Sequence, residues 1–352
     1  MKPMFEGVIH DAIPAEWDKI ELVKENPLLD REFLDIVRRG SNIPFRLVTH
    51  PAYCCAEYTM RLNVLSFSRF FLPIKVTIIC VPVSIGSKGY VGDIKALIQD
   101  YKRRKGIYII LNDDKKLPKN KNRTTRTLPT CVFYNTYENF EEYLNTLRSS
   151  YRRRIITAMQ KGSCLTIKQI NNSEFTEEMY QLYLNVVTAS KYPLEILSID
   201  FFRLFKGQLF CFYDKDTPVA FVLLKNSKDT LYFVFGGMDY NKRAQYDLYY
   251  NMLILVIQQG LAGEFSKIDF GQTAESSKLR VGCKCQDRYM HVMTGNKLLD
   301  ALISRFINIF GYQLKDEGLR AFKKHNQMSV IHRNIEDISD MNKPTKTGEI
   351  CH

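Results

Sequence analysis

The sequence predicts an α/β protein of the α+β type, built from mixed, largely antiparallel sheets flanked by helices. Runs of β-branched and aromatic residues alternate along the chain with segments of helical spacing. Three such runs follow one another closely in the second half, which is typical of an antiparallel meander. With 352 residues, of which 45% are hydrophobic and 25% charged, the composition is globular but the chain is too long for one core of usual size. We therefore expect two domains.

The first half of the chain reads as helix, small sheet, helix and strand. Apolar residues at helical spacing predict helices over residues 30–39 and 93–105, the first of which follows an Asn-Pro turn. Between them, residues 45–83 contain three β-branched and aromatic runs, which predict a small sheet. The apolar run IYIILND at 107–113 predicts a further strand.

A basic segment follows, KKLPKNKNRTTRTLP at residues 115–129. Its dense positive charge and two prolines predict an exposed loop and the boundary between the domains. We expect an N-terminal domain over residues 1–129 and a C-terminal domain over residues 130–334. Residues 335–352 are polar and lack periodicity, so we expect a disordered tail there.

The second half repeats the alternation of helices and strands at greater length. Apolar spacing over residues 140–162 predicts one long or two abutting amphipathic helices. The elements expected after them are a strand at 164–170, helices at 174–190 and 199–205, three strands within 209–237, a strongly apolar helix at 246–260, a short strand at 267–271, and helices at 297–310 and 315–324.

Three segments of this half carry a resemblance to a known family. Residues 214–220, DKDTPVA, look like the turn of its central hairpin, and LYFVFGG at 231–237 looks like the following strand. IDFGQTAESSKLRVG is similar to a late signature made by Asp269, Gly271, Glu275, Lys278 and Gly282. In this order the segments resemble the GNAT superfamily of acyltransferases, in particular its Fem-like and peptidoglycan-type acetyltransferase branch.

The resemblance covers residues 137–293 well and extends to the N-terminal half only by analogy. Fem-like proteins often carry two related GNAT-like domains in tandem, which is the architecture expected for this chain. The activity implied is transfer of an acyl group from a CoA thioester to an amine of a sugar, a peptide or a cell-envelope precursor. A Fem-like aminoacyl transfer from charged tRNA, and a non-catalytic binding protein that retains the fold, are the alternatives.

The late signature supplies the predicted catalytic residues. Acyl transfer to an amine passes through a tetrahedral oxyanion that a positioned cation stabilises, and Lys278 is the predicted cation. Its other interpretation is a solvated charge at a helix end. Glu275, three residues earlier, is either a general base or a salt-bridge partner of the lysine. Asp269 ends a strand, where it either serves the site or caps the following turn.

The predicted cofactor site lies where the third strand of the meander leads into the apolar helix. GNAT proteins bind the cofactor's pyrophosphate with a glycine-containing turn at this point, whereas residues 241–247 contain no glycine and end in Asp247. Lys242 and Arg243 compensate electrostatically for this change. The residues predicted to bind acetyl-CoA or another acyl-CoA are Phe235, Gly236, Gly237, Lys242, Arg243 and Tyr246.

The charge and the cysteines limit which partners and which cellular location we expect. A net charge of +12 and basic clusters at 102–105, 115–126 and 152–154 suit an anionic partner such as tRNA, beside the small-molecule amine acceptor. Nine cysteines without zinc spacing indicate free thiols and no metal site. The first residues lack a signal-peptide core and no apolar run is long enough to span a bilayer, so we expect a cytoplasmic protein.

Overall fold

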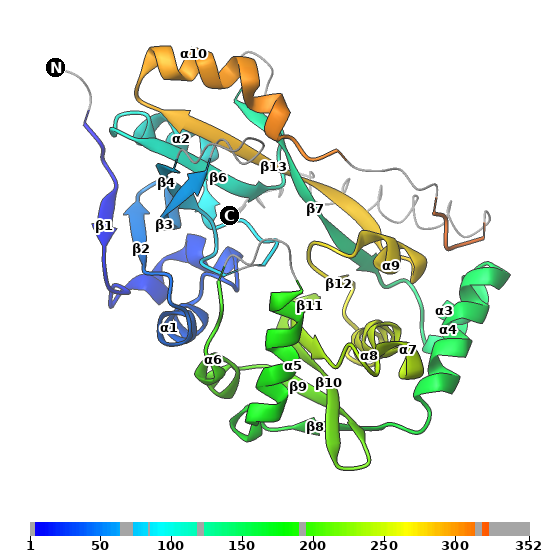
Figure 1. Ribbon diagram of the computed structural model, residues 1–352. Coiled ribbons are helices and arrows are strands. Elements are labelled where there is room, and N and C mark those ends of the chain that lie inside the picture. The colour runs from blue at the N-terminus through cyan, green and yellow to red at the C-terminus, as the bar shows by residue number, and fades with distance from the viewer. Residues whose placement is uncertain are drawn as a thin grey trace, which may run out of the picture.

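One continuous sheet runs through the computed structural model, which describes residues 4–63, 73–83, 85–117, 123–189, 195–313 and 319–323 (Figure 1). Its strand order is β1-β2-β3-β4-β6-β13-β7-β12-β11-β10-β9-β8, with β5 paired to β3. Only the β4–β6 and β11–β12 pairs of this described sheet are parallel. The strands are β1 Val8–His10, β2 Phe45–His50, β3 Tyr53–Asn63, β4 Pro73–Ile79, β5 Tyr90–Gly92, β6 Ile107–Asp113, β7 Thr124–Tyr134, β8 Thr166–Ile170, β9 Gln208–Asp214, β10 Thr217–Ser227, β11 Thr230–Met238, β12 Lys267–Asp269 and β13 Lys284–Thr294.

Helices cover both faces of this sheet. The α-helices are α1 Arg31–Gly40, α2 Ile94–Tyr101, α3 Phe140–Thr146, α4 Ser149–Gly162, α5 Glu177–Thr188, α6 Ile199–Leu204, α7 Arg243–Tyr246, α8 Leu248–Ala262, α9 Glu275–Arg280 and α10 Lys297–Phe306. Short 3-10 helices lie at Trp17–Lys19, Glu21–Glu25, Asn172–Glu174 and Ile307–Phe310. Several α-helices begin at the side-chain caps that their sequences predict, such as Asp30 before α1 and Thr176 before α5.

The two faces of β10 show how the core is divided. Val222 and Leu224 pack into a cluster with α3, α4 and α8, whereas Phe221 and Leu223 pack into a second cluster with α5 and α6. This alternation follows from the period of two along a strand that is buried on both faces. The second cluster also contains the apolar face of α1, so residues from both halves of the chain share one core.

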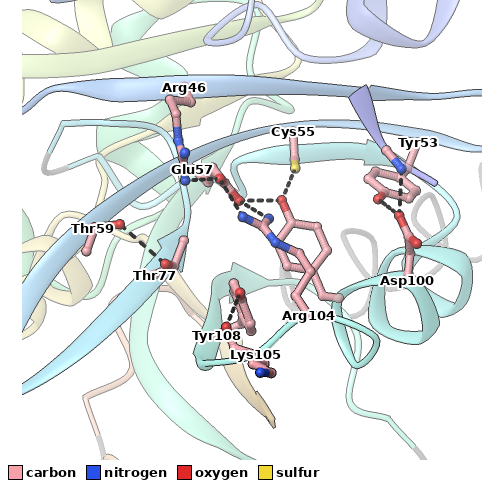
Figure 2. Close-up of polar contacts among 12 residues, drawn as sticks. Arg46, Tyr53, Cys55, Glu57, Thr59, Thr77, Asp100, Arg104, Lys105 and Tyr108 are labelled. Carbon is pink, nitrogen blue, oxygen red and sulfur yellow. Dashed lines mark hydrogen bonds and ion pairs between the residues drawn. The ribbon is translucent and has the colours of Figure 1, made fainter. Parts of the chain in front are cut away.

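A polar cluster lies inside the N-terminal half. The carboxylate of Glu57 on β3 is fully buried and accepts hydrogen bonds from Arg46 at 2.6 Å, Arg104 at 2.8 Å and the Tyr101 hydroxyl at 2.7 Å (Figure 2). The Arg104 guanidinium also lies over the rings of Tyr101 and Tyr108. Because its charge is paired and its oxygens are satisfied, this carboxylate has a structural role.

The predicted fold class is confirmed, as a mixed and mostly antiparallel sheet flanked by helices. The predicted helices over 30–39, 93–105, 174–190, 199–205 and 246–260 are present with shifted ends, and residues 140–162 form two abutting helices, α3 and α4. The three strands within 209–237 form the expected antiparallel meander of β9, β10 and β11.

Two expectations are corrected. Residues 115–129 are not a loop throughout, because β7 begins at Thr124 and pairs with β13 from Thr124 to Val132. The strand therefore runs through the predicted boundary at residue 129, and the division of the chain there stays a prediction. The helix expected over 315–324 is absent from its described part, 319–323, where Phe322 instead forms an isolated bridge with Leu147. The expected tail lies outside the described residues.

Other features expected from composition concern membranes, metals and thiols. Within the described ranges, no helix has the length and apolar character needed to cross a bilayer. The same residues contain no group of three or more His, Cys, Asp or Glu side chains that could hold a metal ion. The cysteines at the eight described positions are free thiols.

Candidate active site

The candidate site is built on a fork between β11 and β12. These parallel strands pair from Thr230–Lys267 to Tyr232–Asp269, after which β11 continues to Met238 with β10 as its partner. The chain that leaves β12 follows β7 instead, since the Phe270 N–H donates to the Cys131 carbonyl at 2.9 Å and the Cys131 N–H donates to the Gly271 carbonyl at 2.9 Å. Two arms therefore diverge from Tyr232.

A β-bulge explains why the arms diverge at this point. Leu224 pairs with Phe233 and Leu223 pairs with Phe235, so Val234 is the extra residue on β11. A bulge bends its strand and increases the local twist, which carries β11 away from β12. On the side of the fork, the backbone of residues 233–238 has no strand partner among the described residues. This edge resembles a sheet edge, with N–H and C=O groups free to bind an extended ligand.

Aromatic side chains lie where the arms separate. The rings of Phe233 on β11 and Phe270 after β12 meet edge to face, with centroids 6.2 Å apart. Tyr249 of α8 lies close by, and burial raises the pKa of its hydroxyl. Cys283 and Cys131 also raise this pKa, whereas Arg243 lowers it. Tyr249 therefore interacts with groups from the arm that follows β12 and from the segment that follows β11.

Lys278 lies on the arm after β12 and is buried, with 3% of its surface exposed. Its ammonium donates to the carbonyl oxygens of Gln272 at 2.7 Å and Gly271 at 3.3 Å. Burial lowers the pKa of the ammonium, while the nearby Cys131 and Cys283 thiols and the carboxylates of Asp269 and Glu275 oppose part of that shift. A solvated helix-end charge is therefore the wrong description of this lysine.

Asp269 and Glu275 surround the same segment. The Asp269 carboxylate accepts from the Gly271 N–H at 2.7 Å and from the Thr130 hydroxyl at 2.9 Å, so it caps the turn that follows β12. The Glu275 carboxylate is half-buried and accepts from the Tyr312 hydroxyl at 3.3 Å. The structure thus brings the three predicted catalytic residues to one arm of the fork.

The residues predicted to bind the cofactor lie on the other arm. Phe235 is half-buried on β11 and packs against Tyr183 and Phe202 of the neighbouring helices. Gly237 lets α5 approach the strand, because a Cβ there would lie 2.6 Å from the backbone of Leu182. Gly236 similarly lies against Met252 of α8. These glycines therefore have packing roles that are independent of cofactor binding.

The charges after β11 are mostly paired with one another. Lys242 and the Tyr246 hydroxyl each bind Asp214 at the end of β9, both at 2.8 Å. Hydrogen bonds from these two groups lower the pKa of the Asp214 carboxyl. By contrast, Arg243 is exposed and forms no ion pair within the described residues. It is the cation of this loop that remains available to an anionic ligand.

Asp247, whose charge stands near the expected pyrophosphate position, is held by α4. Arg154 binds both of its oxygens, at 2.7 and 2.8 Å, and Lys161 lies 3.5 Å away. The hydrogen bonds from Arg154 lower the pKa of this carboxyl, and its residue adopts a left-handed backbone with φ of 49°. The negative charge that the sequence places in the loop is therefore neutralised.

Several polar side chains meet at the seam between the halves. Gln272, next to the signature's glycine, donates to Asn112 Oδ1 at 3.0 Å and to the Leu128 carbonyl at 2.6 Å. Nearby, the buried His291 binds Asp113 through Nε2 at 2.7 Å and Thr124 through Nδ1 at 2.9 Å. These contacts join residues more than 140 positions apart, and no local pattern signals them.

A family model matches the region that contains the fork. The model of an acetyltransferase (GNAT) domain matches residues 132–279, which include β11, the apolar helix α8, β12 and Lys278. This region is a GNAT domain. The acyltransferase class predicted from the late signature is thereby confirmed, whereas the match itself names no donor and no acceptor for this chain.

Two solved structures with TM-scores of 0.50 or more share this fold across most of the chain. The C-terminal domain of a putative lysylphosphatidylglycerol synthetase from Agrobacterium fabrum is 10% identical, with a TM-score of 0.51, covering 80% of this chain and 92% of that one. The L-PGS structure from Bacillus licheniformis is 12% identical, with a TM-score of 0.50 and coverages of 79% and 97%. A FemX structure is 12% identical, with a TM-score of 0.49 and coverages of 80% and 96%. Among curated proteins, no sequence matches.

Proposed function

We propose that the protein transfers an acyl group from a CoA thioester to a primary amine of a sugar, a peptide or an envelope precursor. The observation that carries this proposal is the fork between β11 and β12 within the GNAT domain. Its open edge, residues 233–238, offers backbone N–H and C=O groups to the amides of a pantetheine arm, as a sheet edge does to an added strand. The proposed location is the cytoplasm.

In the proposed reaction the acceptor nitrogen attacks the thioester carbonyl carbon. A C–N bond forms, the C–S bond breaks, and the proton lost by the amine balances the thiolate that leaves. The charge that develops on the carbonyl oxygen needs a preorganised donor. Lys278 is proposed for this role, because its two carbonyl contacts leave one N–H of the ammonium unused.

A carboxylate is proposed to accept the proton from the amine. Glu275 suits this role better than Asp269, because Asp269 already accepts from both Gly271 and Thr130 to hold the turn. Glu275 accepts a hydrogen bond from the Tyr312 hydroxyl at a long 3.3 Å, and its carboxylate has further acceptor capacity. We therefore assign Asp269 to positioning the arm and Glu275 to proton transfer.

Donor binding is the first test of this proposal. Acetyl-CoA or a longer acyl-CoA should raise the melting temperature, because a ligand that binds only the folded state stabilises it. Arg243→Ala should weaken acetyl-CoA binding and leave acetyl-pantetheine, which lacks the pyrophosphate, unaffected. Lys168→Ala, at a lysine of β8 distant from the fork in strand order, is the matched control. If no thioester shifts the melting temperature, the donor assignment is wrong. Once a donor is found, incubation of the labelled donor with a panel of amines identifies the acceptor.

Aminoacyl transfer from charged tRNA is the second candidate, and the net charge of +12 favours it. Many cations of the basic clusters are already paired, among them Arg104, Arg123, Arg126 and Arg154. Arg152 and Arg153 on α4 are exposed, so they are the proposed phosphate contacts. Their joint replacement by glutamate should abolish a salt-dependent affinity for tRNA, and an affinity that does not change with salt contradicts this candidate.

A further inference from the structure

Helix α10 presents an apolar stripe to solvent. Leu298, Leu302 and Phe306 recur every four residues, and 83%, 56% and 43% of their surfaces are exposed. Residues four apart lie on one face of an α-helix, so these side chains form a continuous row. Large apolar residues exposed singly are ordinary, but a row of three along one helix is a marker of an interaction surface.

The charges around this row all have one sign. Arg305 is exposed on the same side of α10 as the stripe, together with the small Ala301, and Lys297 is exposed at the first residue of the helix. The acidic residue of this helix, Asp300, is on the opposite side, where it is buried and bound by Arg123 at 2.5 Å. The exposed face of α10 therefore combines apolar side chains with positive charge and carries no negative charge.

A second basic segment lies against the start of the helix. Gly295, just before α10, is so close to residues 102–104 that a Cβ on it would lie 2.8 Å from the Arg104 carbonyl oxygen and 2.9 Å from that of Lys102. Within this segment Arg104 is bound by Glu57 (Figure 2). Lys105, by contrast, is exposed. The positive charge of the α10 face thus continues beyond the helix.

We propose that the exposed face of α10 docks the protein on an anionic phospholipid bilayer surface. An amphipathic helix with apolar residues on one side and flanking Lys and Arg lies in the plane of the interface, with its apolar row among the acyl chains and its cations among the headgroups. Charge complementarity selects this occupant, because the face offers cations and apolar groups and no acceptor for a basic partner. The proposal does not depend on which acyl donor the fork binds.

Vesicle sedimentation tests the proposal with the full chain. The protein should sediment with vesicles of equal parts phosphatidylcholine and phosphatidylglycerol, sediment far less with phosphatidylcholine alone, and be released by salt. Leu298→Glu and Leu302→Glu should each weaken sedimentation by roughly tenfold or more. Ile167→Glu, at a residue of β8 that is 45% exposed, is the matched control and should bind as the unchanged chain does.

A fluorescence measurement guards against variants that fail to fold. Leu302→Trp keeps the stripe apolar, and the emission of the introduced indole should shift to shorter wavelength when phosphatidylglycerol vesicles are added. The absence of that shift, or equal sedimentation of Leu302→Glu and the unchanged chain, overturns the proposal. It is also overturned if the lipid-free protein is a dimer that Leu302→Glu converts to a monomer, because the face is then an interface between copies.

Discussion

At the residue scale, Lys278 is the charge whose burial has most consequence for the proposed chemistry. Replacing it by methionine keeps the side-chain length and removes the cation. If the ammonium stabilises the oxyanion, Lys278→Met should lower kcat by about 10²- to 10³-fold, as loss of an oxyanion donor does elsewhere. Steady-state kinetics with the identified donor and acceptor measures this.

The control for Lys278 is another buried lysine. Lys225 on β10 is 8% exposed, and its ammonium lies 3.2 Å from Asp30 and over the Phe33 ring of α1. Lys225→Met should lower stability without a comparable loss of kcat. A folded Lys278→Met protein that retains full kcat contradicts the catalytic assignment and leaves this lysine the role of holding the turn at Gly271 and Gln272.

The same lysine should make stability depend on alkaline pH. Burial places the pKa of its ammonium in the folded protein below the ordinary 10.5. Between these two values the unfolded state binds more protons, so the contribution of Lys278 to the free energy of unfolding rises with pH. Urea unfolding at stepped alkaline pH should show a smaller rise for Lys278→Met than for the unchanged chain. Equal pH slopes for the two proteins contradict this prediction.

Asp113 at the seam should carry a large share of local stability. It is fully buried. Burial raises the pKa of its carboxyl, but the hydrogen bonds from His291 and Tyr90 lower this pKa by more, so the net shift is downward. Asp113→Asn breaks this arrangement and should cost about 3 kcal/mol at neutral pH, measured by urea unfolding. Asp114→Asn, which removes an exposed carboxylate 3.8 Å from Lys88, should change stability by less than about 0.5 kcal/mol.

The same carboxyl should make the free energy of unfolding depend on acid pH. A carboxyl with a depressed folded pKa stabilises the protein above its unfolded value of 3.8, and that contribution is lost as pH falls through the folded pKa. Stability of the unchanged chain should therefore fall more steeply below pH 3.8 than that of Asp113→Asn. Parallel acid limbs show that this carboxyl is not linked to folding.

At the element scale, the close packing of α5 on β11 depends on Gly237. A Cβ at this position would lie 2.3 Å from the Phe221 ring and 2.7 Å from the backbone nitrogen of Tyr183. Gly237→Ala should therefore destabilise the protein by about 3 kcal/mol, because the helix backbone has no rotamer with which to yield. Thermal or urea unfolding measures the loss.

Gly271 gives the matched comparison, because it is a glycine with open space. Its φ is 69° and no atom lies within 4 Å of the position of a Cβ. Gly271→Ala should cost only about 1–2 kcal/mol, from backbone conformation alone. If Gly237→Ala is the milder of the two, steric packing does not explain the glycine on β11.

Elements with a strong local pattern could be predicted from the sequence, and those that depend on distant partners could not. The apolar run of α8 predicts a buried helix, and the sequence places it almost correctly. The first part of β7, residues 124–129, lies in the segment that the sequence predicts to be a loop because of its charge and two prolines. This part of β7 nevertheless pairs with β13, and β7 gains one residue relative to β13 between Thr127 and Thr130. Pro129 lies in this bulge, where a missing N–H does not interrupt the ladder.

The site shows the same division between local and distant information. The order Asp269, Gly271, Glu275, Lys278 predicted which arm would carry the candidate residues. It could not predict that Lys278 would be buried, because the thiols and carboxylates around it come from β7 and from both ends of the segment. Nor could it predict that Asp247 would be neutralised, since Arg154 lies 93 positions earlier in the chain.

At the scale of the whole molecule, the strand order is the feature that local patterns leave open. β13 follows the GNAT domain in sequence, yet it lies between β6 of the first half and β7 of the second. One apolar cluster likewise contains Trp17 and Phe33 from the first half and Phe201 and Phe221 from the second. Both features couple the halves, although the sequence predicts two domains.

This coupling predicts a single cooperative unfolding transition. The chain has one tryptophan, Trp17, which is fully buried in the first half, so its fluorescence should follow urea unfolding with the same midpoint as far-UV circular dichroism. Leu253→Ala in α8 makes the test decisive, because this residue is buried in the other apolar cluster and its loss costs about 2–5 kcal/mol. In one cooperative unit the Trp17 midpoint falls together with the circular dichroism. A Trp17 midpoint that Leu253→Ala leaves unchanged shows instead that the halves unfold independently, with the shared cluster too weak to join them.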